Sequence, residues 1–82
     1  MEVELLFFGG SREQAGTDRA RVTLPPSVET IGDTIEWLGR EYPLLLPRLR
    51  ALRIARNAEF ATSGERVHDG DVLAVIPPVS GG

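Results

Sequence analysis

Short stretches of alternating hydrophobic and polar residues predict that much of this chain forms β-strands. The alternation is clean over residues 19–24 and 52–56, where every second side chain is apolar. Residues 3–8 are apolar along one face, whereas the other face becomes apolar only toward the end, so we expect that end to be covered. A further short strand is predicted over residues 58–61, around Phe60.

Residues 72–76 differ from the other stretches because every position is apolar. A run of this kind predicts a strand that is covered on both faces and therefore central in its sheet. The simplest position for it is beside the first strand, in parallel orientation, which makes the predicted sheet mixed.

One segment has the period of a helix. The apolar residues between Ile31 and Tyr42 are spaced three and four apart, so they share one face. Thr30 followed by Asp33 is an N-terminal capping signature, and Pro43 ends the helix. A second capping pattern begins at Ser11 and predicts a single helical turn before Gly16.

The predicted order of elements is therefore β-β-α-β-β-β, with one substantial helix. One helix covers one face of a sheet, which predicts a two-layer α+β domain over residues 1–76. Pro77 and Pro78 end the last strand, and we expect residues 77–82 to form a flexible C-terminal tail.

Composition removes several classes of function. The 82 residues contain no cysteine and a single histidine, His68, so thiolate or histidine-rich metal sites are excluded and no metal is expected. The net charge of −3 argues against a nucleic-acid binder, which needs a basic face. No apolar run is long enough to cross a bilayer and the N-terminus lacks a signal-peptide pattern, so we expect a cytoplasmic protein without a membrane partner.

Two other local patterns are better explained as structure than as sites. Asp69 and Asp71 flank Gly70, but a calcium loop needs further oxygen ligands, so a turn is predicted, with His68 at the surface beside it. The sequence Gly9-Gly10 precedes a helical turn, yet no phosphate-loop motif follows, and a loop is predicted there.

The C-terminal sequence is the strongest functional candidate. Pro77 and Pro78 stiffen the chain, and the small residues Val79 and Ser80 lead to Gly81-Gly82. Glycines without side chains suit a narrow channel, so this arm is able to carry the Gly82 carboxylate into the active site of another protein. The carboxylate is a group that ATP activates as an acyl-adenylate, and the catalytic residues then belong to the partner.

Three motifs make the chain similar to the small, sulfur-carrying subunits of molybdopterin synthase, a family of ubiquitin-like proteins. "DGDVLAVIPPVSGG" resembles the C-terminal signature of that family, "FFGGSREQAG" resembles its first strand and following loop, and "NAEF" resembles its Asn-x-Glu-aromatic turn. The resemblance covers the whole chain and implies a β-grasp fold, in which a mixed sheet packs against one main helix.

The resemblance further implies a carrier with no bound cofactor and no catalysis of its own. An ATP-dependent enzyme adenylates Gly82, and a sulfur donor converts the adenylate to a thiocarboxylate, which holds the sulfur covalently. The tail then enters the large subunit of molybdopterin synthase, in a heterotetramer, and sulfur passes to precursor Z (cyclic pyranopterin monophosphate). An apolar docking patch is predicted at Phe7, Leu73, Val75 and Ile76, although these side chains also suit a core.

Other functions stay open at this point. A carrier for thiamine synthesis or for tRNA thiolation uses the same chemistry, and a ubiquitin-like modifier attaches the same carboxylate to lysines of other proteins. A β-grasp binding module without covalent chemistry is the alternative of another class, and it does not need the two terminal glycines.

Overall fold

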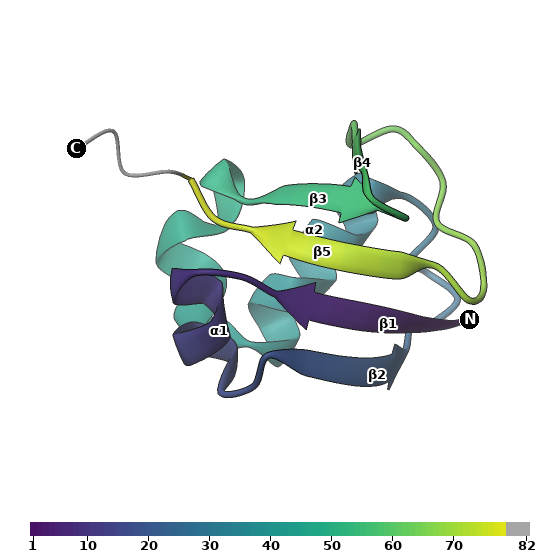
Figure 1. The fold of residues 1–82 in the computed structure, drawn as a ribbon. Helices are drawn as coiled ribbons and strands as arrows, with labels where there is room; N and C mark the ends of the chain where they lie inside the picture. Colours follow the sequence, from purple (N-terminus) through teal and green to yellow (C-terminus); the bar gives the residue numbers. More distant parts are fainter. Residues whose placement is uncertain (79–82) are drawn as a thin grey trace.

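The computed structural model describes residues 1–78, and Val79, Ser80, Gly81 and Gly82 of the predicted tail lie outside the described residues. Its helices and strands are β1 (Glu2–Phe7), α1 (Gly10–Ala15), β2 (Arg19–Thr23), α2 (Ile31–Glu41), the 3-10 helix η1 (Pro43–Ala51), β3 (Arg53–Arg56), β4 (Glu59–Ala61) and β5 (Val72–Ile76) (Figure 1). The predicted strands and main helix are all present, with ends that differ by a residue or two.

The strands form one mixed sheet in the order β2-β1-β5-β3-β4. β1 and β5 are parallel, with Leu5 opposite Leu73, and the other neighbouring strands are antiparallel. This arrangement confirms the prediction that residues 72–76 form a central strand beside the first one. The long helix α2 lies behind the sheet, so the described chain has the two layers expected of an α+β fold (Figure 1).

Helix α2 begins where the sequence predicts because its first turn is capped in both directions. The Thr30 hydroxyl accepts from the Asp33 backbone N–H at 3.1 Å, and an Asp33 carboxylate oxygen accepts from the Thr30 N–H at 3.2 Å. At the other flank of the helix, Gly39 leaves room for η1, since a Cβ there would lie 2.8 Å from Leu49 Cδ2 and 3.0 Å from Leu46 Cδ2. The close contact expected at Gly39 is therefore confirmed.

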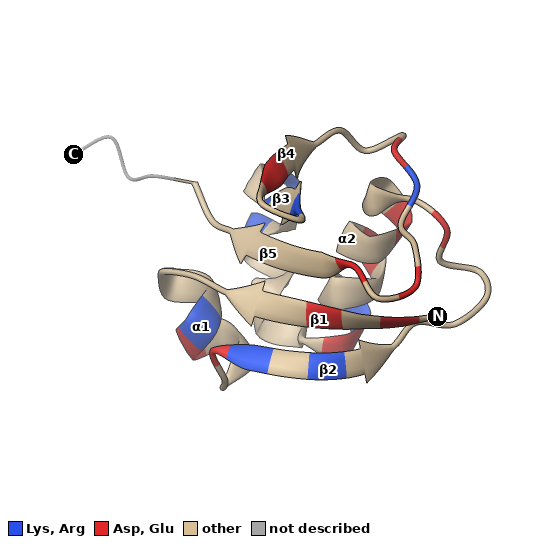
Figure 2. Cartoon of the chain, turned by 45° about the vertical axis from the view of Figure 1, so that its right-hand side comes forward, with Lys and Arg blue, Asp and Glu red and all other residues tan. Residues whose placement is uncertain are grey.

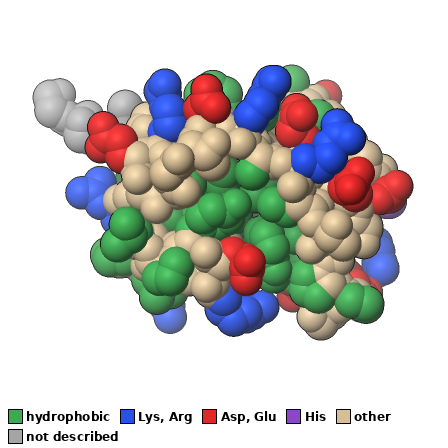
Figure 3. Space-filling model, turned by 90° about the horizontal axis from the view of Figure 1, so that it is seen from below, with side chains coloured by type: hydrophobic (Ala, Val, Ile, Leu, Met, Phe, Trp, Pro, Cys, Tyr) green, Lys and Arg blue, Asp and Glu red, His purple; other side chains and the backbone are tan. Residues whose placement is uncertain are grey.

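The core lies between α2 and one face of the sheet. Its largest fully buried side chains come from both layers: Leu5, Leu24, Ile31, Leu38, Leu45, Ile54 and Leu73. Seen from below, on the side of the edge strand β2, apolar side chains reach the surface within a rim of charged residues (Figure 3). Ala20 and Val22 of β2 are half-buried, which matches the inward face predicted for this strand.

The opposite face of the sheet is more open than the sequence predicts. Burial alternates along β5, because Leu73 and Val75 point into the core whereas Val72, Ala74 and Ile76 are only half-buried. Phe8, expected under cover at the end of the first strand, is 48% exposed. Both expectations were wrong for the same reason, since α2 covers one face of the sheet and the apolar pattern does not show which face.

The capping pattern predicted at Ser11 is also wrong. Helix α1 has Gly9 at its N-cap and no side-chain cap, and Ser11 is fully buried inside the helix. The predicted end of this helix is confirmed, because Gly16 is left-handed with φ of 79° and its N–H donates to the Arg12 carbonyl at 3.0 Å. The hydroxyl of Ser11 instead contacts the end of the sheet, as described below.

Candidate functional site

The chain leaves the sheet at the end of β5, beside the turn that joins β1 to α1. The Phe8 N–H donates to the Val75 carbonyl at 3.2 Å, which continues the parallel pairing beyond the end of β1. Pro77 then lies against Gly9, since a Cβ at Gly9 would be 3.2 Å from the Pro77 Cγ. Figure 1 shows β5 ending at the side of the molecule where α1 lies, so the predicted tail begins there.

The structure describes only the first two residues of the predicted tail. Pro77 is half-buried and Pro78 is exposed, and both follow the last strand as expected. Val79, Ser80, Gly81 and Gly82 lie outside the described residues, so the role of the Gly82 carboxylate stays a prediction.

The predicted docking patch is not a surface. Phe7 is 2% exposed, and Leu73 and Val75 are fully buried, so these three side chains belong to the core. Only Ile76 is partly exposed. Sequence reasoning combined residues from both faces of β5, because all five positions of the strand are apolar.

The open face of the sheet carries a different apolar surface. Cross-strand pairing places Leu6 of β1 beside Ala74 of β5, Ala74 beside Ala55 of β3, and Ala55 beside Phe60 of β4. We call these four residues the cross-strand row. Leu6 and Ala74 are half-buried, Ala55 is only 7% exposed, and Phe60 is 60% exposed. The row therefore offers partners an apolar surface at Leu6 and Ala74 on β1 and β5 and at Phe60 on β4.

Charged residues border the cross-strand row. Arg19 of β2 lies opposite Leu6 at one end, and at the other end the Arg53 guanidinium lies over the Phe60 ring, 4.7 Å from its centre. Figure 2 shows acidic residues on the first part of β1 and basic residues on β2, whereas β5 carries no charge along its length. An apolar centre with a charged border is the usual composition of a protein interface.

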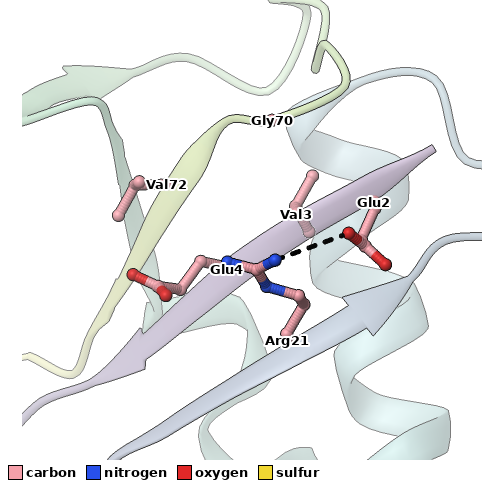
Figure 4. A pocket seen from close by; sticks show the side chains of 6 residues that line it. All are labelled: Glu2, Val3, Glu4, Arg21, Gly70 and Val72. Atoms are coloured by element: carbon pink, nitrogen blue, oxygen red, sulfur yellow. Dashed lines mark ion pairs between the residues drawn. The ribbon is translucent and has the colours of Figure 1, made fainter.

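A shallow hollow of about 200 Å³ lies on the same face, near the start of β1. In Figure 4, Arg21 extends from β2 across β1, where its guanidinium lies 3.8 Å from the Glu2 carboxylate. Both side chains are largely exposed, so this ion pair is worth little. Because ligand pockets usually enclose about 300 Å³ or more, we assign this hollow to the sheet surface and not to a small-molecule site.

The acidic residues beside His68 support a turn, as the sequence predicts. Asp69 accepts from the Glu2 N–H at 2.7 Å, and Asp71 accepts from the His68 N–H at 2.8 Å. His68 itself is exposed. Over residues 1–78 the structure contains no group of three or more side chains able to hold a metal ion. Within the same residues no helix is both long and apolar enough to cross a membrane.

The titratable groups with shifted pKa values belong to caps and turns. Hydrogen bonds from the Glu29 and Thr30 backbones lower the pKa of Asp33, and a backbone hydrogen bond from Thr62 does the same for Glu65. Burial raises the pKa of Tyr42, and the nearby Glu41 adds to the shift. These shifts report local structure, because backbone hydrogen bonds and burial cause them.

Sequence reasoning missed the cross-strand row, although one signal was present. In the first strand, Glu2 and Glu4 share a face with Leu6, whereas Val3, Leu5 and Phe7 are uniformly apolar, which marks the face of Leu6 as the open one. The parallel register then places Ala74 beside Leu6. Ala55 and Phe60 join them only through the pairing of β3 and β4, which no local pattern shows.

Comparison with known proteins gives consistent matches along the whole chain. The sequence model of the ThiS family matches residues 5–82. A molybdopterin synthase sulfur carrier subunit from Drosophila yakuba is 40% identical over 85 residues, which cover all of this chain and 92% of the relative.

Two solved structures have the same fold over their full length and over the whole of this chain. The small archaeal modifier protein SAMP1 from Haloferax volcanii is 33% identical, with a TM-score of 0.79. A chain from the complex of subunits 1 and 2 of the molybdopterin-converting factor of Helicobacter pylori is 26% identical, with a TM-score of 0.67. The mixed sheet and single long helix are thus those of the ubiquitin-like β-grasp fold, as expected.

Proposed function

This chain belongs to the ThiS family, and we propose that it is the sulfur carrier subunit of a molybdopterin synthase. The observation that carries the proposal is the match to the Drosophila carrier subunit, which is 40% identical and extends over the whole chain. The match includes the residues of the predicted tail, and the described fold presents the start of that tail at one end of the sheet.

The proposed chemistry takes place on the Gly82 carboxylate. An activating enzyme joins the carboxylate to the AMP part of ATP and releases pyrophosphate. A sulfur donor then displaces AMP, so a C–O bond is exchanged for a C–S bond and a thiocarboxylate results. This chain supplies the carbonyl carbon and an arm to deliver it. The catalytic residues are expected on the activating enzyme and on the large synthase subunit.

We further propose that the cross-strand row docks on the large subunit while the tail enters its active site. The Helicobacter pylori structure supports such a partner, because it is a complex of subunits 1 and 2 of the molybdopterin-converting factor. In this chain the row and the start of the tail are joined by β5, which contains both Ala74 and Ile76. The acceptor would be precursor Z, and a heterotetramer in the cytoplasm is part of the proposal.

Mass spectrometry of the intact protein tests the carrier function. The chain is incubated with its cognate activating enzyme, ATP and a sulfide source, and we expect a mass gain equal to the exchange of one oxygen for sulfur. A chain without Gly81 and Gly82 is the control and should gain nothing. An unchanged mass with an activating enzyme that is competent on another carrier would refute the proposal.

A second candidate function is covalent modification of proteins. It is favoured by the similarity to SAMP1, which is 33% identical to this chain, against 26% for the Helicobacter chain. Both functions begin with adenylation of Gly82, so the mass experiment does not separate them. Synthesis of molybdopterin with the matching large subunit supports the first, and conjugates on lysines of other proteins support the second. Transfer to a thiamine precursor or to tRNA is the outcome expected of the remaining carrier functions.

A further inference from the structure

The turn between β1 and α1 has features that the predicted chemistry leaves unexplained. Gly9 has φ of 55° and ψ of −137°, a positive-φ conformation that favours glycine. Ser11 is fully buried although it is polar and lies in a helix of only six residues. Both residues lie at the end of β5, where the tail begins.

Contacts join this turn to the last residues of the sheet. The Ser11 hydroxyl lies 2.6 Å from the Phe8 carbonyl oxygen and 3.3 Å from the Val75 carbonyl oxygen. Because a hydroxyl has one hydrogen, these two acceptors share it. Pro77 lies against Gly9, where the absence of a side chain leaves space for the proline ring.

These contacts are made at the end of β5, where the chain leaves the sheet. The Val75 carbonyl belongs to the last buried residue of β5, and the fixed ring of Pro77 begins the tail two residues later. The β1–α1 turn thus contacts both the Val75 carbonyl and the Pro77 ring where the chain leaves the sheet.

We propose that Gly9 and Ser11 are positioning residues that aim the C-terminal tail, and we call the pair the tail clamp. The inference rests on the proposed function, because the orientation of the tail matters for delivering the Gly82 carboxylate to a partner's active site. The tail clamp acts through Val75 and Pro77, and its loss should slow the reaction without preventing docking.

The chain offers a matched control for the glycine. A Cβ at Gly10 would meet no heavy atom within 4 Å, whereas one at Gly9 would meet Pro77 and would need a positive-φ backbone. Gly9→Ala and Gly10→Ala are therefore the same chemical change at adjacent positions, and only the first affects the tail clamp.

Ser11→Ala tests the other half of the tail clamp, and the fold should tolerate it. The Phe8 carbonyl keeps a bond from the Ser11 backbone N–H at 3.2 Å, and the Val75 carbonyl keeps the bond from the Phe8 N–H. Neither buried acceptor is left without a donor. A thermal unfolding curve for each variant identifies any that fails to fold.

The first measurement follows the direction of the tail and needs no partner. Because the chain has no cysteine, Glu36→Cys on α2 and Ser80→Cys in the tail introduce the only two sites for nitroxide labels. Electron paramagnetic resonance gives the distribution of distances between them. We expect Gly10→Ala to match the unsubstituted chain, and Gly9→Ala and Ser11→Ala to show a shifted or broader distribution. Equal distributions in all four proteins would overturn the inference.

The second measurement is steady-state adenylation of unlabelled proteins by the activating enzyme. A misaimed tail should lower kcat by roughly 10- to 100-fold, the effect of a small misplacement of reacting groups, with little change in KM. An unchanged kcat in both Gly9→Ala and Ser11→Ala would show that the orientation of the tail does not affect adenylation. If the unsubstituted chain is never adenylated, the proposed function fails, and the distance measurement alone then decides whether the tail clamp exists.

Discussion

The Asn57 side chain connects the turn between β3 and β4 to the start of β5 by way of Asp71. Its amide nitrogen donates to an Asp71 carboxylate oxygen at 3.0 Å, and its amide oxygen accepts from the Val72 N–H at 2.9 Å. Asp71 is 8% exposed, so this carboxylate depends on its donors. These two hydrogen bonds of the Asn57 side chain fix the register in which the central strand β5 begins.

Asn57→Gly should therefore destabilise the protein. Glycine accepts the left-handed backbone at this position, where φ is 51°, so the substitution removes only the side-chain bonds. We expect a loss of about 1–3 kcal/mol in the free energy of unfolding, measured by urea denaturation. Ala58→Gly is the control in the same turn, where φ is 73°, and it should leave stability unchanged or raise it. Equal effects of the two substitutions would contradict the assigned role of Asn57.

Leu73→Ala should test the assignment of β5 residues to core and surface. Leu73 is fully buried, and deleting its branched side chain should cost about 2–5 kcal/mol in unfolding free energy. Ile76→Ala should cost clearly less, because Ile76 is only half-buried on the open face. Urea denaturation of both variants provides the comparison. A larger loss for Ile76→Ala would reverse the assigned orientation of the strand.

Leu6→Glu should weaken binding of the large synthase subunit, because it places a charge in the cross-strand row. Loss of a dominant interface contact costs about 2 kcal/mol or more, so we expect Kd to rise by roughly tenfold or more by calorimetry. Thr23→Glu, near the far end of edge strand β2, is the control and should bind normally. If Leu6→Glu binds as tightly as the unsubstituted chain and is folded, the row is not the docking surface.

The capping box of α2 should make stability depend on pH in acid. Hydrogen bonds hold the pKa of Asp33 below its ordinary value of 3.8, so the unfolded chain binds this proton more readily than the folded one. The stabilisation is present above the ordinary pKa and is lost as pH falls through the lower folded pKa, roughly between pH 5 and pH 2. Asp33→Asn removes this titration, so its urea midpoint should fall less between roughly pH 5 and pH 2. Asp18→Asn, in an exposed loop, is the control with which it is compared. Identical acid profiles for the two variants would disprove the link.

Deletion of Gly81 and Gly82 should separate fold from function. Both glycines follow the described domain, whose core lies within residues 1–78, so the thermal unfolding midpoint should stay the same. Sulfur loading should be abolished, as measured by mass spectrometry of the intact protein. A truncated chain that still supports molybdopterin synthesis would favour the non-covalent binding module over the carrier.

Much of the architecture followed from local sequence. Strand alternation, the helical period of residues 31–42 and the Thr30 cap predicted the elements, and the uniformly apolar run at residues 72–76 predicted the central parallel strand. These predictions succeeded because backbone geometry and burial act on neighbouring residues, with period two in strands and 3.6 in helices. The carrier tail was also predicted locally, from two prolines followed by two glycines.

The tertiary structure alone decided which face of the sheet is open and what contacts the end of β5. A strand that is apolar at every position does not show which face α2 covers, so Leu73 and Val75 were taken for a surface while Leu6 and Ala74 were overlooked. Ser11 looked like a cap, because its true contacts with Val75 are made across 64 residues of sequence. The sequence by itself thus determined the elements and the proposed chemistry of the C-terminus. Long-range packing decided the open face of the sheet and the contacts at the end of β5, because contacts between distant residues leave no periodic pattern in the sequence.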